Sequence, residues 1–110
     1  MNEIKTLLES AGDDRALAGD LLELFEEQAV EEIGILADAA QRCDAKQLAR
    51  TAHKLVGSAV ACGFVDLSQE LRSLELHCLH NIPADIVQRI EVLNLLLEKG
   101  RDEMTRLLAD

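Results

Sequence analysis

The side chain in this sequence that is best placed to act as a nucleophile is the imidazole of His53. His53 follows Ala52, which belongs to a stripe of apolar residues at three- and four-residue spacing. Such spacing is typical of a helix, and the position next to the stripe puts the ring at the edge of the core, where it reaches solvent. A lone histidine at such an edge is usually structural, so the surrounding residues decide its role.

The residues that would share the helix face of His53 are small or of modest size. They are Ala49, Val56, Gly57 and Val60, at i−4, i+3, i+4 and i+7. Glycine costs a helix about 1 kcal/mol relative to alanine. Gly57 therefore indicates either room for a group approaching the imidazole or close packing against a neighbouring helix.

The other residues that could do chemistry do not form a recognisable site. Cys43, Cys62 and Cys78 are odd in number and contain no C-x-x-C pair, which favours reduced, mostly packed thiols. His77 and His80 could share a helix face, but no further ligands accompany them. No Glu-x-x-His pair of a bundle metal site occurs, so we predict no metal, and a metal-dependent enzyme or sensor is the weaker alternative.

The charge of the chain limits its partners. The formal net charge is −10 and the pI is about 4.6, so the long-range field repels nucleic acids and anionic lipid surfaces. The longest apolar run is far too short for a membrane span, and the N-terminus lacks the pattern of a signal peptide. We expect a cytoplasmic protein that binds neither nucleic acid nor membrane.

The positions of capping residues predict the first three of five helices. Asn2 can cap a short first helix, which ends before Gly12-Asp13-Asp14. One of these two aspartates opens a second helix that runs to about Arg42, and Asp44 is well placed to cap the third, which carries His53.

Glycine and proline mark the rest of the predicted architecture. Gly63 can end the third helix with a positive φ, and Pro83 lies near the first turn of the fifth. Gly100 is a weak point in that last helix, where a kink could form. Short connections between long helices favour antiparallel neighbours, so we predict an all-α fold: an up-down-up-down four-helix bundle with a short additional N-terminal helix. We expect a single domain over residues 1–110, and a monomer.

The sequence around His53 resembles the signature of histidine-containing phosphotransfer (Hpt) domains over residues 52–75: Ala52-His53-Lys54-Leu55-Val56-Gly57-Ser58, followed by Gly63, Leu67, Leu71, Leu74 and Glu75. The resemblance implies that His53 is a phosphoacceptor, and that Glu75 accepts a hydrogen bond from the imidazole and orients it. Gly57 then gives room for the phosphorylated ring.

The sequence departs from the family pattern three residues after the histidine, where Val56 replaces the usual lysine. We expect Lys54, or else Arg50, to supply positive charge near the phosphoryl group instead. Ser58 matches the family and could bond either a phosphate or partner group or the i−4 carbonyl. The expected docking surface for a receiver domain comprises Ala49, Arg50, Val56, Ser58 and Val60.

The function that the resemblance implies is a phosphorelay intermediate. Such a module accepts a phosphoryl group from a receiver-domain aspartate and passes it to another, with response-regulator receivers and a hybrid sensor histidine kinase as partners. It is a phosphocarrier and not an enzyme: it has no cofactor of its own, and Mg²⁺ is expected in the partner receiver. The alternative is a helical protein–protein interaction module without phosphotransfer. Met1 favours a free-standing protein over a domain of a larger kinase.

Overall fold

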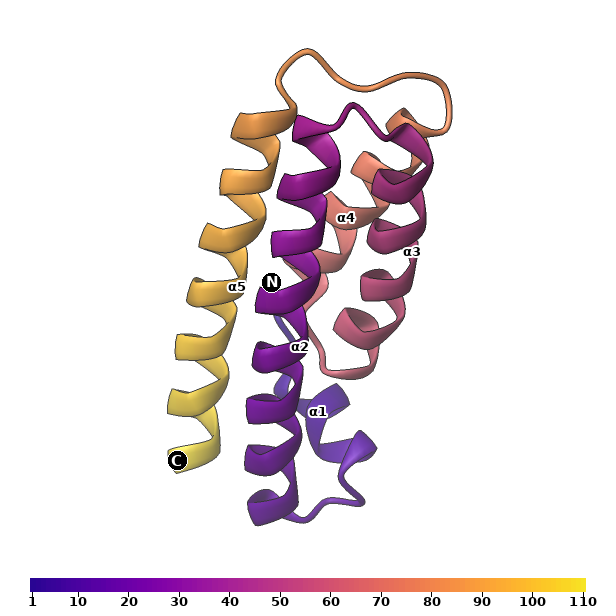
Figure 1. Ribbon diagram of the computed structural model, residues 1–110. Coiled ribbons are helices and arrows are strands. Elements are labelled where there is room, and N and C mark those ends of the chain that lie inside the picture. Colours follow the sequence, from indigo (N-terminus) through magenta and orange to yellow (C-terminus); the bar gives the residue numbers. More distant parts are fainter.

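The chain folds into five α-helices, four of which form an antiparallel bundle. The computed structural model describes residues 1–110, and the bundle measures 42 × 21 × 20 Å. The long helices run alternately up and down, as predicted, and the short first helix lies at the lower end (Figure 1). The helices are α1 (Ile4–Ser10), α2 (Arg15–Gln41), α3 (Ala45–Ala61), α4 (Val65–Cys78) and α5 (Ile86–Ala109).

Aspartate caps fix where α2 and α3 begin, which confirms two sequence predictions. The Asp14 carboxylate accepts a hydrogen bond from the Leu17 N–H at 3.0 Å, and the Asp44 carboxylate accepts one from the Gln47 N–H at 3.0 Å. Each bond satisfies a backbone donor that has no partner within its helix. Because Asp44 sets the start of α3, it also sets the height at which His53 leaves the bundle.

Two predicted helix starts are wrong. Asn2 does not cap α1, whose N-cap is Glu3; its side-chain oxygen instead accepts a hydrogen bond from the Asp66 N–H in the first turn of α4. Pro83 lies in the turn before α5, where its carbonyl accepts a bond from the Ile86 N–H. At Asn2 a contact with α4 outweighs the local pattern, whereas at Pro83 a turn comes before the helix.

A single hydrophobic core runs the length of the bundle. Twenty-five buried residues form one cluster, to which all five helices or their flanking turns contribute. The most extensive packing joins α3 to α4, and α1 closes the lower end of that hairpin. None of the helices has the length and apolar composition that a membrane crossing requires.

The turn between α3 and α4 is held from both sides. Gly63 adopts a φ of 78°, as predicted, and its carbonyl accepts a 2.9 Å hydrogen bond from the Glu3 N–H. Phe64 follows and packs closely against Gly100. The contact is so tight that a Cβ at Gly100 would lie 2.6 Å from the Phe64 ring. α5 continues through Gly100 without a break, so this glycine serves the close approach of a neighbour rather than ending the helix.

A partly buried ion pair joins α2 to α3 next to the candidate nucleophile. Glu32 is only 7% exposed, and its carboxylate accepts a 3.0 Å hydrogen bond from the Lys54 ammonium. A carboxylate removed from water without a partner would be costly. Lys54 is therefore engaged by the fold, although it stands directly after His53 in the chain.

The Phe64 contact predicts opposite effects for alanine at two helical glycines. Gly100→Ala should destabilise the protein by about 1–3 kcal/mol, because the new methyl group clashes with the ring. Gly34→Ala is the matched control: its Cβ meets nothing within 4 Å, so it should stabilise α2 by up to about 1 kcal/mol. Urea unfolding followed by circular dichroism measures both. Equal stabilisation by the two substitutions would contradict the tight contact.

The Glu32–Lys54 pair predicts a rescue. Lys54→Met should lower the free energy of unfolding by about 1–3 kcal/mol, because it leaves the Glu32 carboxylate buried without a partner. The double variant Glu32→Gln/Lys54→Met should recover most of that loss. Lys46→Met, which removes an exposed cation from the same helix, should change stability by less than about 0.5 kcal/mol. Additive losses in the double variant would show that the pair does not form.

Candidate functional site

His53 projects from the middle of α3 and meets Glu75 of α4. Its Nδ1 lies 2.7 Å from Glu75 Oε2; the His53 side chain is 77% exposed, whereas that of Glu75 is 16% exposed. The sequence placed the ring at the edge of the core, and the structure confirms that position. The Glu75 carboxylate lies beneath the His53 imidazole, and the imidazole is accessible from solvent.

This contact determines which ring nitrogen can react. An ionised carboxylate only accepts hydrogen bonds, so the proton of the neutral imidazole belongs on Nδ1. The lone pair then remains on Nε2. The contact can therefore hold the imidazole in one orientation and leave Nε2 available as a nucleophile.

The surface one turn beyond His53 is open. Gly57 is exposed, and a Cβ placed there would meet nothing within 4 Å. This excludes the alternative that Gly57 packs closely against another helix. Val60 is exposed further along the same face. The serine hydroxyls that form hydrogen bonds are those of Ser10, Ser68 and Ser73, so the half-buried Ser58 hydroxyl is free.

The expectation that Val56 belongs to an apolar docking surface is wrong. Val56 is only 5% exposed. It stands four residues after Ala52 and three before Ala59, both fully buried, so it lies on the core side of α3. Ala49 is also largely buried and contributes only the floor of the surface beside His53.

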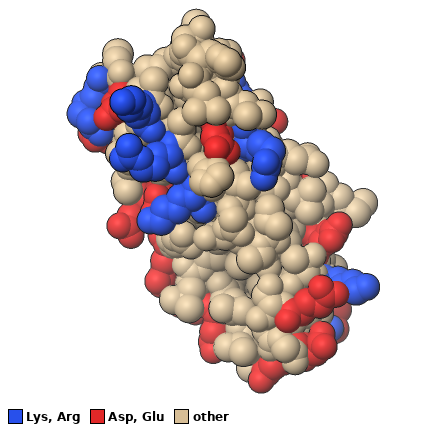
Figure 2. All heavy atoms as spheres, turned by 90° about the vertical axis from the view of Figure 1, so that its right-hand side faces the viewer, with Lys and Arg blue, Asp and Glu red and all other residues tan.

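The free positive charges near His53 are those of Lys46 and Arg50. With Ala49, His53, Glu75 and Leu79 they line a hollow of about 310 Å³ between α3 and α4. Figure 2 shows Lys and Arg atoms gathered on the upper part of this face. We expected a role for Arg50 but missed Lys46, although its seven-residue spacing from His53, two helical turns, could have revealed it.

The remaining candidate ligands do not assemble into a metal site. No group of three or more His, Cys, Asp or Glu side chains is placed to hold an ion. His77 is engaged by Asn81 at 3.0 Å and by Arg89 at 3.3 Å. Burial raises the pKa of the Cys62 and Cys78 thiols, which disfavours the thiolate form that metals and electrophiles require.

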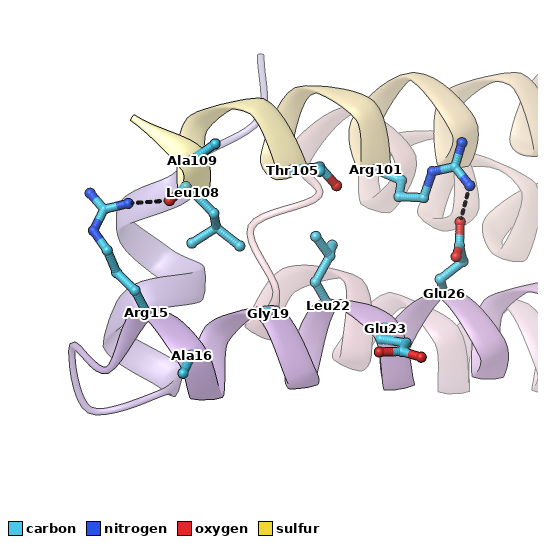
Figure 3. A pocket seen from close by; sticks show the side chains of 10 residues that line it. All are labelled: Arg15, Ala16, Gly19, Leu22, Glu23, Glu26, Arg101, Thr105, Leu108 and Ala109. Carbon is cyan, nitrogen blue, oxygen red and sulfur yellow. Dashed lines mark hydrogen bonds and ion pairs between the residues drawn. The ribbon is translucent and has the colours of Figure 1, made fainter.

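The largest hollow lies elsewhere, between the start of α2 and the end of α5. It encloses about 470 Å³, and two arginines border it (Figure 3). The Arg15 guanidinium donates to the Leu108 carbonyl at 2.8 Å, and Arg101 pairs with Glu26 at 2.9 Å. Both cations are satisfied by the fold, and no histidine or cysteine lines the hollow, so His53 remains the candidate nucleophile.

Comparisons with known proteins agree with the geometry. The model of the Hpt domain family matches residues 20–109. No curated protein sequence gives a significant match. Among solved structures, the chain is similar to the crystal structure of histidine-containing phosphotransfer protein B (HptB) from Pseudomonas aeruginosa PAO1. The TM-score is 0.87 at 21% sequence identity, over 98% of this chain and 94% of that chain.

At that identity the structural likeness shows a shared fold, while the family match covers most of the chain and includes His53, Gly57 and Glu75. The protein therefore belongs to the Hpt domain family, whose members are phosphocarrier modules of two-component phosphorelays that interact with receiver domains and kinases.

Proposed function

We propose that this protein is a phosphorelay intermediate that carries a phosphoryl group on His53 between aspartates of receiver domains. The observation that carries the proposal is the 2.7 Å contact between His53 Nδ1 and Glu75 beneath an exposed ring. The whole of residues 1–110 acts as one Hpt domain, because α1, outside the matched region, packs into the same core through Leu7. Because that core is complete within one chain, the protein acts as a monomer.

The transfer step needs no proton from solvent. The Nε2 lone pair attacks the phosphorus of the receiver's aspartyl phosphate, so a P–N bond forms as the P–O bond breaks and leaves the receiver carboxylate. The imidazole gains a positive charge and keeps its Nδ1 proton, which Glu75 holds. That charge develops during the reaction, so the Glu75 carboxylate stabilises the transition state more than the starting imidazole.

The partner supplies the rest of the chemistry. Phosphoryl transfer depends mainly on positioning and on stabilising charge. We expect the acidic pocket, the lysine and the Mg²⁺ to belong to the receiver. The receiver docks around His53 on Gly57, Ser58, Val60 and the neighbouring cations of α3. Upstream, a hybrid sensor histidine kinase provides the first receiver.

The test of this function is transfer of label to His53. With Mg²⁺ and a panel of phosphorylated receivers, wild-type protein should acquire acid-labile, base-stable phosphate and His53→Gln should acquire none. His80→Gln, which removes another exposed histidine, should be labelled like the wild type. Absence of label in folded wild type, from every receiver and from phosphoramidate, would overturn the proposal. Receiver binding without labelling would instead favour a helical interaction module.

Glu75 should affect the rate of transfer rather than receiver binding. Glu75→Gln keeps an acceptor for Nδ1–H but removes the charge, so transfer at saturating receiver should slow by about tenfold, which corresponds to about 1.4 kcal/mol. Glu75→Ala should be slower still, with KM nearly unchanged in both. Glu70→Gln is the matched control on the same helix. A wild-type rate in Glu75→Ala would contradict the orienting role.

A further inference from the structure

α3 concentrates positive charge in a strongly acidic protein. Lys46, Arg50 and Lys54 follow each other at four-residue intervals, and α3 contains no Asp or Glu, whereas the whole chain has a net charge of −10. Residues at this spacing lie along one side of a helix. All three are exposed.

The three cations differ in what already binds them. Lys54 is paired with the buried Glu32, which holds it toward α2. Neither Lys46 nor Arg50 takes part in any ion pair of the structure. Both instead border the hollow that His53 and Glu75 share. Two unpaired cations thus stand beside the nucleophile on the side toward the start of α3.

We propose that Lys46 and Arg50 form the phosphate-binding site of this protein, holding the phosphoryl group while His53 carries it. The inference rests on the phosphocarrier function proposed above. A phosphoryl group bears nearly two negative charges at neutral pH, and these two side chains offer two positive ones. The guanidinium can bind two phosphate oxygens at once, and the lysine adds a mobile point charge.

The surroundings explain why the charge is supplied from this side. Val56, three residues after His53, is uncharged and buried, so no cation is available there. Arg50 and Lys46 precede His53 by one and two turns, or about 4.5 and 10.5 Å along the helix axis, within the reach of long flexible side chains. Ala49 and Leu79 form the apolar parts of the same hollow, so they offer no competing charge to the phosphoryl group.

A docking role for the same cations makes a different prediction. Charges that only attract an acidic receiver change the rates of transfer in both directions and leave the equilibrium between the two free phosphoproteins unchanged. Charges that hold the phosphoryl group stabilise phospho-His53 itself. They therefore shift that equilibrium toward this protein, and they lower the pH at which the phosphoryl group loses its last proton.

The experiment compares wild type with Lys46→Gln/Arg50→Gln and with the charge-matched control Lys99→Gln/Arg106→Gln, which removes two exposed cations of α5. Each protein is phosphorylated with phosphoramidate, which releases ammonia as the His53 Nε2–P bond forms. The ³¹P chemical shift of phospho-His53 is then followed against pH. A second measurement gives the final distribution of label between each protein and one receiver.

In Lys46→Gln/Arg50→Gln the pH at which the phosphoryl group loses its last proton should rise by about 0.5–1 unit. The rise should be smaller in 1 M salt, where the screening length falls to about 3 Å. The label should shift about three- to tenfold toward the receiver, while the control matches wild type. An unchanged ionisation and equilibrium would overturn the inference even if transfer slowed, because the cations would then act in docking alone.

Failure of the underlying function has a separate signature. If phosphoramidate and the receiver leave wild type unlabelled at His53, both proposals fall. If wild type is labelled and the double variant behaves identically, only the phosphate-binding site falls. Both side chains are exposed, so the fold should survive, as circular dichroism will show, and the single variants carry the same test if the double variant unfolds.

Discussion

The packing of α3 against α4 is the interaction on which the site depends, because it brings the imidazole of one helix onto the carboxylate of the other. His53 and Glu75 lie at similar distances on either side of the turn at Gly63, so in an antiparallel pair they meet at the same height. A shift of the pair by one turn would move them about 5.4 Å apart along the axis. The register of this hairpin is therefore a functional constraint as well as a structural one.

Contacts far from His53 hold that register. The left-handed conformation of Gly63 allows the tight turn, and the Glu3 N–H binds its carbonyl. Phe64 is fully buried and lies against Gly100 of α5, and its ring meets that of Phe25 of α2 in a tilted contact, with 4.7 Å between centroids. The two aromatic residues of the chain thus fasten the turn to the long helices, which leaves the outer face of α3 free to bind partners.

Much of this structure could be predicted from the sequence because the relevant signals are local. Aspartate caps, the glycine at the α3–α4 turn and the apolar periodicity predicted the number, order and direction of the helices. The family pattern singled out His53 and Glu75, which the structure places in contact. The errors at Asn2 and Pro83 arose where a long-range contact or a preceding turn decided the outcome.

The charges around His53 were harder to predict, because they depend on which neighbour each side chain meets. Lys54 is adjacent in sequence but binds Glu32, whose burial no local pattern indicated. Val56 lies three residues after His53, a spacing that often puts two residues on one helix face, yet its side chain turns to the core beside Ala52 and Ala59. Lys46 lies two turns away in sequence and borders the same hollow. Helical spacing alone gives neither burial nor the pairing of a charge across helices.

We propose that Glu75 accepts the hydrogen bond from Nδ1–H of His53 and so leaves Nε2 as the nucleophile. Long-range ¹H–¹⁵N NMR spectra of phosphorylated, ¹⁵N-labelled protein identify which ring nitrogen carries phosphorus. We predict a single species phosphorylated on Nε2, with a protonated Nδ1. Phosphorus on Nδ1, or a mixture of the two isomers, would contradict the account, because the Glu75 contact could not then orient the ring during transfer.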